Sequence, residues 1–143
     1  MKIAIINGPN LNLLGKREPE VYGSLSFEDY LKELQQLFPD VNFQYYQTNI
    51  EGELISAIQE YGFMTDGIVL NPASYTHTSV GIGDAIAAVN APVVEVHISN
   101  VHAREDFRKI SHVSAQVKGT ITGLGLRGYQ LAIQWLIEEK RKG

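Results

Sequence analysis

Two titratable residues interrupt an apolar stretch in the second half of this 143-residue chain. Glu95 and His97 stand two positions apart among valines. Because side chains alternate along a β-strand, both would point to the same face. Burying a carboxylate and an imidazole costs free energy unless the two groups are paired. The spacing therefore indicates either a structural ion pair or a histidine acid/base oriented by a carboxylate.

A second polar segment follows another apolar run. Asn71 ends that run, and asparagine is common in turns, although its amide can also bind a ligand. His77 directly precedes Thr78 and Ser79, which are suited to capping a helix. A lone histidine in a turn is as often a surface residue as a ligand-binding one. Asn71 and His77 become functional candidates only if the fold brings them close to His97.

Three cationic side chains follow the titratable pair. Arg104, Arg108 and Lys109 lie on either side of Glu105-Asp106, as on a solvated helix face, although one arginine could instead face inward. Just beyond the apolar run, the backbone N–H groups of Ile98 and Ser99 would form a cradle for a carboxylate. An inward arginine and this backbone cradle would both favour a small anionic ligand.

Apolar runs typical of buried strands alternate with helical patterns along the chain. The runs predict strands at residues 2–7, 42–48, 67–71, 92–98 and 120–123. The helical patterns begin at Ser24 or Ser26 and continue at residues 51–61, 79–90 and 126–142. This order predicts a single α/β catalytic domain over residues 1–143. Its expected core is a flavodoxin-like, doubly wound, parallel five-stranded sheet with helices on both faces.

The first predicted helix carries clear boundary signals. A serine hydroxyl can cap its start, and Pro39-Asp40 should end it. Its apolar spacing predicts a buried face made of Phe27, Leu31, Leu34 and Leu37 or Phe38.

The carboxyl ends of the strands are where such sheets bind ligands. The polar residues named above follow the third and fourth predicted strands. The first strand is followed by a connection over residues 8–23, which is longer than most connections in compact folds and therefore suggests function. We expect these three segments to meet around the opening of one ligand-binding site.

The composition excludes several classes of protein. The formal charge of −4 and the pI near 5.5 provide no general attraction to nucleic acid. No cysteine is present, which excludes disulfides, thiolate nucleophiles and iron–sulfur clusters. No apolar run approaches the roughly 18 residues of a membrane span, and the short apolar run at the N-terminus does not resemble a secretory signal. We expect a cytoplasmic protein with a small-molecule partner, no membrane partner and no nucleic-acid partner.

Two patterns in the sequence could suggest a dinucleotide or a zinc ion, but each lacks the neighbouring residues that such a site requires. Residues 123–128, Gly-Leu-Gly-Leu-Arg-Gly, match a dinucleotide-binding pattern, but the 15 residues after Gly128 leave no room for a second strand with a ribose-binding acid. A tight strand-to-helix turn is the preferred interpretation. His77, His97, His102 and Glu95 lack the close helical spacing of zinc ligands. The lysines stand in polar contexts or open a strand, which disfavours a Schiff base. We therefore expect no metal and no cofactor.

Four blocks of residues, taken together, resemble the type II 3-dehydroquinate dehydratase family. They are Asn-Gly-Pro-Asn-Leu at 7–11, Arg-Glu-Pro at 17–19 with Tyr-Gly at 22–23, Thr-His-Thr-Ser at 76–79, and Glu-Val-His-Ile-Ser-Asn at 95–100. The resemblance extends over essentially the whole chain. It implies the elimination of water from 3-dehydroquinate to give 3-dehydroshikimate through an enolate, without a cofactor.

The resemblance also implies a role for each matching residue. Tyr22 would be the base that removes the proton alpha to the ketone, and His97 the acid that protonates the departing hydroxyl. Arg17 would stabilise charge beside the tyrosine, Asn10 would help to hold the water that stabilises the enolate, and Glu95 would orient His97. The substrate would be bound by Asn71, His77, Ile98, Ser99, Arg108 and, from a neighbouring subunit, Asp84.

One departure from the family concerns the subunit contact. The family commonly has an arginine before the aspartate, where this chain has Gly83. The resemblance implies a homo-oligomer, a dodecamer built of trimers, and the glycine would weaken the contact around Asp84. Two other classes remain open from sequence. One is a flavodoxin-like module that binds a nucleotide or flavin, and the other is an oligomeric scaffold that has lost activity.

Overall fold

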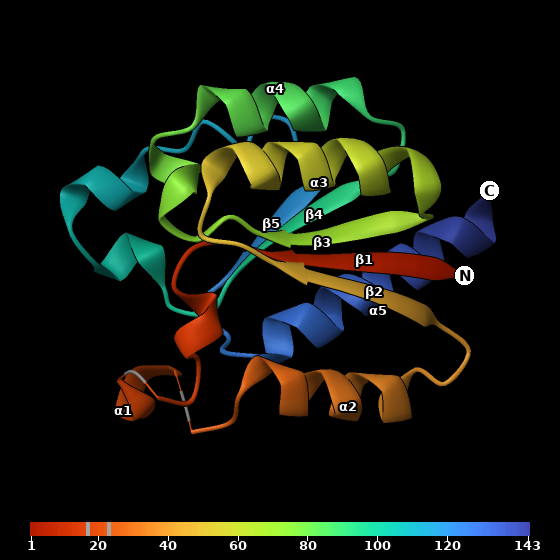
Figure 1. Cartoon of the computed structure of the whole chain (residues 1–143), viewed down its shortest axis with the longest axis horizontal. Helices are drawn as coiled ribbons and strands as arrows, with labels where there is room; N and C mark the ends of the chain where they lie inside the picture. The colour runs from red at the N-terminus through yellow and green to blue at the C-terminus, as the bar shows by residue number, and fades with distance from the viewer. Residues whose placement is uncertain (17, 23) are drawn as a thin grey trace.

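A five-stranded parallel sheet forms the centre of the molecule (Figure 1). The computed structural model describes residues 1–16, 18–22 and 24–143, apart from the side chains of Val21 and Tyr22. The strands lie in the order β2-β1-β3-β4-β5, which is the doubly wound, flavodoxin-like order expected from the sequence. Their bounds are β1 Lys2–Asn7, β2 Asn42–Gln47, β3 Gly67–Asn71, β4 Val93–His97 and β5 Gly119–Thr122.

Helices cover both faces of the sheet (Figure 1). α3 (Glu51–Met64) and α4 (Val80–Ala88) lie on one face, and α2 (Phe27–Leu37) and α5 (Arg127–Lys142) lie on the other. A hydrophobic core lies on each face of the sheet, and successive strand residues alternate between the two. Ile3 and Ile5 pack towards α2 and α5, while Ile6 packs towards α3 and α4. This is the expected two-sided burial of a parallel sheet.

The remaining helices are short and lie in the connections. They are η1 Leu11–Leu13, α1 Pro19–Tyr22, η2 Ala73–His77, η3 Val101–Ala103 and η4 Asp106–Lys109. Most of them follow β1, β3 or β4 at the carboxyl ends of the strands. Within the described residues, no helix combines the length and the apolar character needed to cross a membrane.

The buried face of α2 differs from the sequence prediction. Ser26 caps the helix, accepting a hydrogen bond from the Asp29 N–H at 3.2 Å, as one of the two expected serines should. Of the two alternatives at its end, Phe38 packs against the core and Leu37 is 53% exposed, while Tyr30, which was not predicted, is buried in the core. The tyrosine can be buried because its hydroxyl donates to the Leu126 carbonyl at 2.8 Å.

Candidate active site

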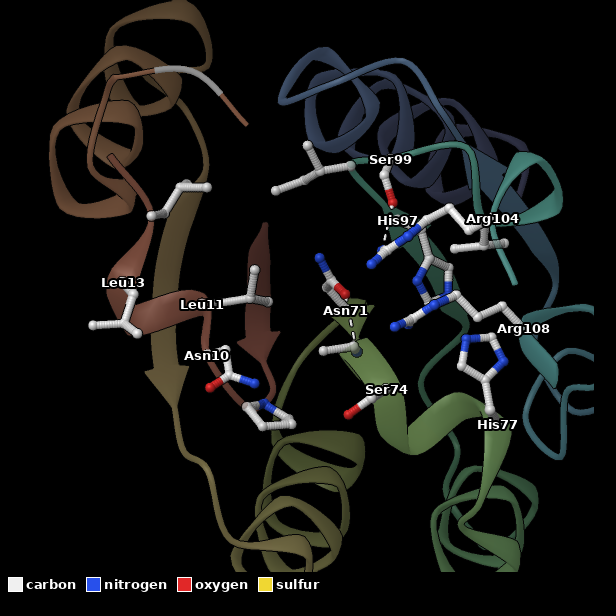
Figure 2. Close-up of a pocket in the computed structure, with 15 residues that line it drawn as sticks. Asn10, Leu11, Leu13, Asn71, Ser74, His77, His97, Ser99, Arg104 and Arg108 are labelled. Atoms are coloured by element: carbon white, nitrogen blue, oxygen red, sulfur yellow. Dashed lines mark hydrogen bonds between the residues drawn. The ribbon is translucent and has the colours of Figure 1, made fainter. Parts of the chain in front are cut away.

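A pocket opens at the carboxyl ends of β1, β3 and β4, where the sequence analysis expected three segments to meet (Figure 2). Arginines and histidines stand on one side of it, and the η1 segment with its leucines stands on the other. Seven of the predicted site residues line this pocket. They are Asn10, Asn71, His77, His97, Ile98, Ser99 and Arg108.

The predicted pairing of Glu95 and His97 is present at the end of β4. Nε2 of His97 lies 2.5 Å from Oε2 of Glu95, and the two side chains are 7% and 1% exposed. His97 lines the pocket, whereas Glu95 lies behind it. The bond to the carboxylate leaves Nδ1 as the imidazole nitrogen available to exchange a proton with a ligand.

The Glu95 carboxylate is held by hydroxyl groups as well as by His97. Thr76 Oγ1 donates to Oε2 at 2.6 Å, while Ser114 and Thr120 hydroxyls donate to Oε1 at 3.0 and 3.3 Å. Burial by itself would raise the pKa of Glu95, but the hydrogen bonds and charge of His97 and the bonds from Thr76 and Ser114 lower it below its usual value. The group is therefore an ionised acceptor within the protein.

His77 is fixed in the turn after β3. Its Nδ1 donates to the Ile110 carbonyl at 2.7 Å, which leaves Nε2 free to accept a proton or a hydrogen bond from a ligand. Its ring stacks near that of His97, with centroids 6.4 Å apart. Partial burial lowers the pKa of His77, and the neighbouring His97 and Arg108 lower it further despite the carbonyl bond. The neutral imidazole is thus favoured near neutral pH.

Two of the three predicted cations face the pocket. Arg104 donates to the Ser99 hydroxyl at 3.2 Å, and Arg108 is paired with Glu105. Lys109 instead pairs with Asp106 on the exposed side of η4. The sequence pattern predicts one inward arginine without saying which, and the family resemblance implies Arg108, so Arg104 is the additional site residue that the structure reveals. The run of charges carries no signal of which arginine faces inward.

Asn71 is both a turn residue and a pocket residue. Its Oδ1 accepts the Ala73 N–H at 3.0 Å, and its Nδ2 donates to the hydroxyl of Tyr129 at 2.9 Å. That hydroxyl donates in turn to Oδ1 of Asn7 at 2.7 Å. Tyr129 is fully buried, and this burial raises the pKa of its hydroxyl. The hydrogen bonds with Asn71 and Asn7 lower the pKa by less, so that it stays above its ordinary value. The neutral phenol therefore fixes the amide at the base of the pocket.

Asn10 begins the opposite wall in a left-handed conformation. Its φ is 71°, and its N–H donates to Oδ1 of Asn49 at 3.0 Å. Gly8 lies two residues before Asn10. A Cβ at this position would lie 2.7 Å from the Pro72 carbonyl oxygen, so only glycine fits between the connections that follow β1 and β3. Leu11, Leu13 and Leu14 then provide the apolar part of the pocket. Their helical turn, η1, gave no sequence signal of a ligand site.

Besides Glu95, one described site residue that was predicted lies outside the pocket lining, and two predicted residues cannot be placed. Asp84 is exposed on α4, outside the pocket lining, and its predicted contact is with another subunit. Arg17 and the side chain of Tyr22 lie outside the described residues.

The glycine-rich segment after β5 forms a turn, as its sequence context predicts. Gly123 and Gly125 have φ angles of 88° and 64°, and their N–H groups donate to the carbonyls of His97 and Ile98 at 3.1 and 3.0 Å. The turn therefore supports the backbone at the end of β4 from behind.

The fold and the pocket define a class of protein. It is a flavodoxin-like α/β protein with a buried histidine–carboxylate pair and two arginines around a small cavity. The family model for class II dehydroquinase matches residues 1–137, and the chain belongs to this family.

Individual relatives agree with this assignment. The chain is 53% identical to a 3-dehydroquinate dehydratase of Fusobacterium nucleatum, over 99% of this chain and 100% of the relative. It is 54% identical to that of an Exiguobacterium species, over 99% and 97%. The crystal structure of type II dehydroquinase from Butyrivibrio crossotus superposes with a TM-score of 0.90 at 47% identity, covering 95% of this chain and 97% of that one. A nucleotide or flavin module is not favoured.

Proposed function

We propose that this chain is a 3-dehydroquinate dehydratase, which eliminates water from 3-dehydroquinate to give 3-dehydroshikimate. The observation that carries the proposal is the His97–Glu95 pair, 2.5 Å apart, at the wall of a pocket that also contains Arg104 and Arg108. A proton donor and a cationic binding surface in one cavity suit a substrate that is both a carboxylate and a hydroxy-ketone.

The substrate carboxylate would be held by Arg108 and by the backbone of Ile98 and Ser99, and its hydroxyls by Asn71 and His77. Both side chains are anchored. Asn71 is held by Ala73 and Tyr129 and keeps its second Nδ2 hydrogen for the substrate, while His77 is held by the Ile110 carbonyl through Nδ1 and keeps Nε2. Anchored groups bind a ring with little loss of side-chain freedom, which supports accurate placement of the reacting carbon. Asp84 of a neighbouring subunit would complete the binding site.

Elimination then needs a base, an acid and a stabiliser of the enolate. Tyr22, as phenolate, would take the proton alpha to the ketone, and His97 would protonate the hydroxyl that leaves as water when the carbon–oxygen bond breaks. Asn10 would hold the water that stabilises the enolate oxygen. A phenol ordinarily has a pKa near 10, so a base active near neutrality needs about 4 kcal/mol of preferential stabilisation of the phenolate, for which Arg17 is the proposed source.

We also propose a cytoplasmic homo-oligomer, a dodecamer built of trimers. Asp84 is exposed on α4, where a second subunit could present it to another pocket. Large apolar side chains are exposed beside it and near the pocket, among them Val80, Phe107 and Ile110, and such exposure is typical of surfaces covered by a partner.

The direct test is turnover. The purified chain is mixed with 3-dehydroquinate, and the rise in enone absorbance is followed as the product forms. A steady rise that depends on protein concentration is expected. A well-folded, oligomeric preparation that never produces the enone would contradict the proposal.

A further inference from the structure

The buried carboxylate of Glu95 is enclosed by donors on both oxygens. Oε2 accepts from His97 and from Thr76, the latter at 2.6 Å, and Oε1 accepts from Ser114 and Thr120. Thr76 is 2% exposed and Glu95 is 1% exposed, so the Thr76 bond has no access to bulk water. A hydrogen bond of this kind, to a buried charge, is stronger than a neutral one and costly to lose.

The hydroxyl groups come from segments that also build the pocket. Thr76 lies in η2 directly before His77, and the Ser111 hydroxyl lies 3.1 Å from its Oγ1. The His112 N–H donates to the Thr76 carbonyl at 2.9 Å, while Ser114 reaches back to Glu95. The strand β4, the turn after β3 and the segment 110–114 are thus joined at one carboxylate.

This enclosure determines which His97 nitrogen is free. With hydroxyl donors on both oxygens, the carboxylate is held as an acceptor, and Nε2 of His97 must donate to it. Nδ1 then exchanges protons with the ligand. Without the Thr76 hydroxyl, Oε2 would keep only the hydrogen bond from the His97 imidazole. The carboxylate could then rotate or take a proton, and either change would allow the other tautomer of His97.

We propose that Thr76 and Ser114 are positioning residues of the dehydration reaction, which hold Glu95 so that His97 presents a single nitrogen to the substrate. The inference rests on the proposed function. Thr76 makes the larger contribution to positioning Glu95, because it is buried and its hydroxyl bonds the same oxygen, Oε2, as His97. Ser114 is exposed, so water can replace its hydroxyl.

The test compares Thr76→Val, which removes the hydroxyl but keeps the shape, with Thr76→Ser, which retains it. We expect kcat to fall about tenfold or more in the valine variant with KM within about twofold, and to be largely restored by serine. Ser114→Ala should lower kcat by less. Thr48→Val is the matched control, because Thr48 is also buried and its hydroxyl also donates to a carboxylate at 2.6 Å, that of Glu53, away from the pocket. It should keep kcat.

A spectroscopic measurement separates positioning from general damage. The ¹⁵N resonances of the histidine side chains report which ring nitrogen carries the proton. In the wild-type chain and in Thr76→Ser, neutral His97 should be protonated at Nε2, and in Thr76→Val this preference should weaken. Unchanged kcat and tautomer in the valine variant would overturn the inference, as would an equal loss in Thr48→Val. Absence of turnover in the wild-type chain would instead count against the proposed function.

Discussion

The ionised carboxylate of Glu95 links the chemistry of the pocket to the stability of the fold. Its folded pKa is lowered, because the bonds from His97, Thr76 and Ser114 outweigh the burial that would raise it. A group of this kind stabilises the fold above its unfolded pKa, about 4.3 for glutamate, and the contribution is lost as the pH falls through the folded pKa.

Glu95→Gln should therefore lower the free energy of unfolding near neutral pH. The difference from wild type should shrink as the pH falls below about 4.3 and through the lower folded pKa of Glu95, because protonation removes the advantage of the carboxylate. Urea unfolding at a series of pH values measures this difference. Asp66, whose hydrogen bonds from Lys140 and Lys2 lower its pKa, is present in both proteins and cancels from the comparison. A difference that stays constant with pH would show that Glu95 is not ionised in the fold.

The proposed base gives the second prediction for a single residue. Tyr22→Phe removes one oxygen atom and keeps the ring, so turnover should fall by orders of magnitude while 3-dehydroquinate still binds. Calorimetric titration gives the affinity, and the enone assay gives the rate. Near-normal turnover would assign the proton abstraction to another group.

Much of the pocket could be predicted from sequence because its residues follow strands. Asn71 and His97 were visible as polar groups at the ends of apolar runs, and the strand-end rule placed them together. Arg104 and Arg108 could not be distinguished, because their orientation depends on the short turns η3 and η4 rather than on a repeating pattern. The role of Tyr129 was hidden as well, since its helical position predicts only core packing.

Among the connecting elements, the turn after β3 contains backbone strain. Ala73 begins η2 with a φ of 53°, a left-handed conformation that is unfavourable for a residue with a Cβ. Ala73→Gly should stabilise the fold by about 1 kcal/mol, although glycine also gains freedom in the unfolded chain. Chemical denaturation measures the change. Ala87→Gly, at an exposed position of α4, is the control of opposite sign and should destabilise by up to about 1 kcal/mol.

The helices and strands were predicted well where the hydrophobic period was long, and less well at their ends. α3 runs to Met64, three residues beyond the predicted end, because apolar periodicity marks the buried face and not the last turn. Gly83 shows a second limit. A Cβ there would lie 2.4 Å from the His112 carbonyl oxygen, so the glycine that was predicted to weaken a subunit contact also admits the segment 110–114 beside α4. Close approach between distant segments leaves no trace in local sequence.

At the scale of the whole molecule, the pocket of one chain is proposed to need a residue of another. Asp84 is exposed on α4 and lies outside the pocket lining of its own chain. If it acts across a subunit contact, Asp84→Ala and Tyr22→Phe each inactivate a different contributor to the same composite site. Mixing the two variants can then restore sites that neither variant has alone.

Subunits of Asp84→Ala and Tyr22→Phe that are unfolded together and refolded should regain activity. In a random equal mixture about one quarter of the sites combine an intact Tyr22 from one chain with an intact Asp84 from its neighbour, so about that fraction of wild-type turnover is expected. Each variant refolded alone is the control for background, and sedimentation of the mixture reports whether oligomers form. Activity that never exceeds the mean of the two separate variants, in a mixture that does assemble, would place Asp84 outside the site of its neighbour.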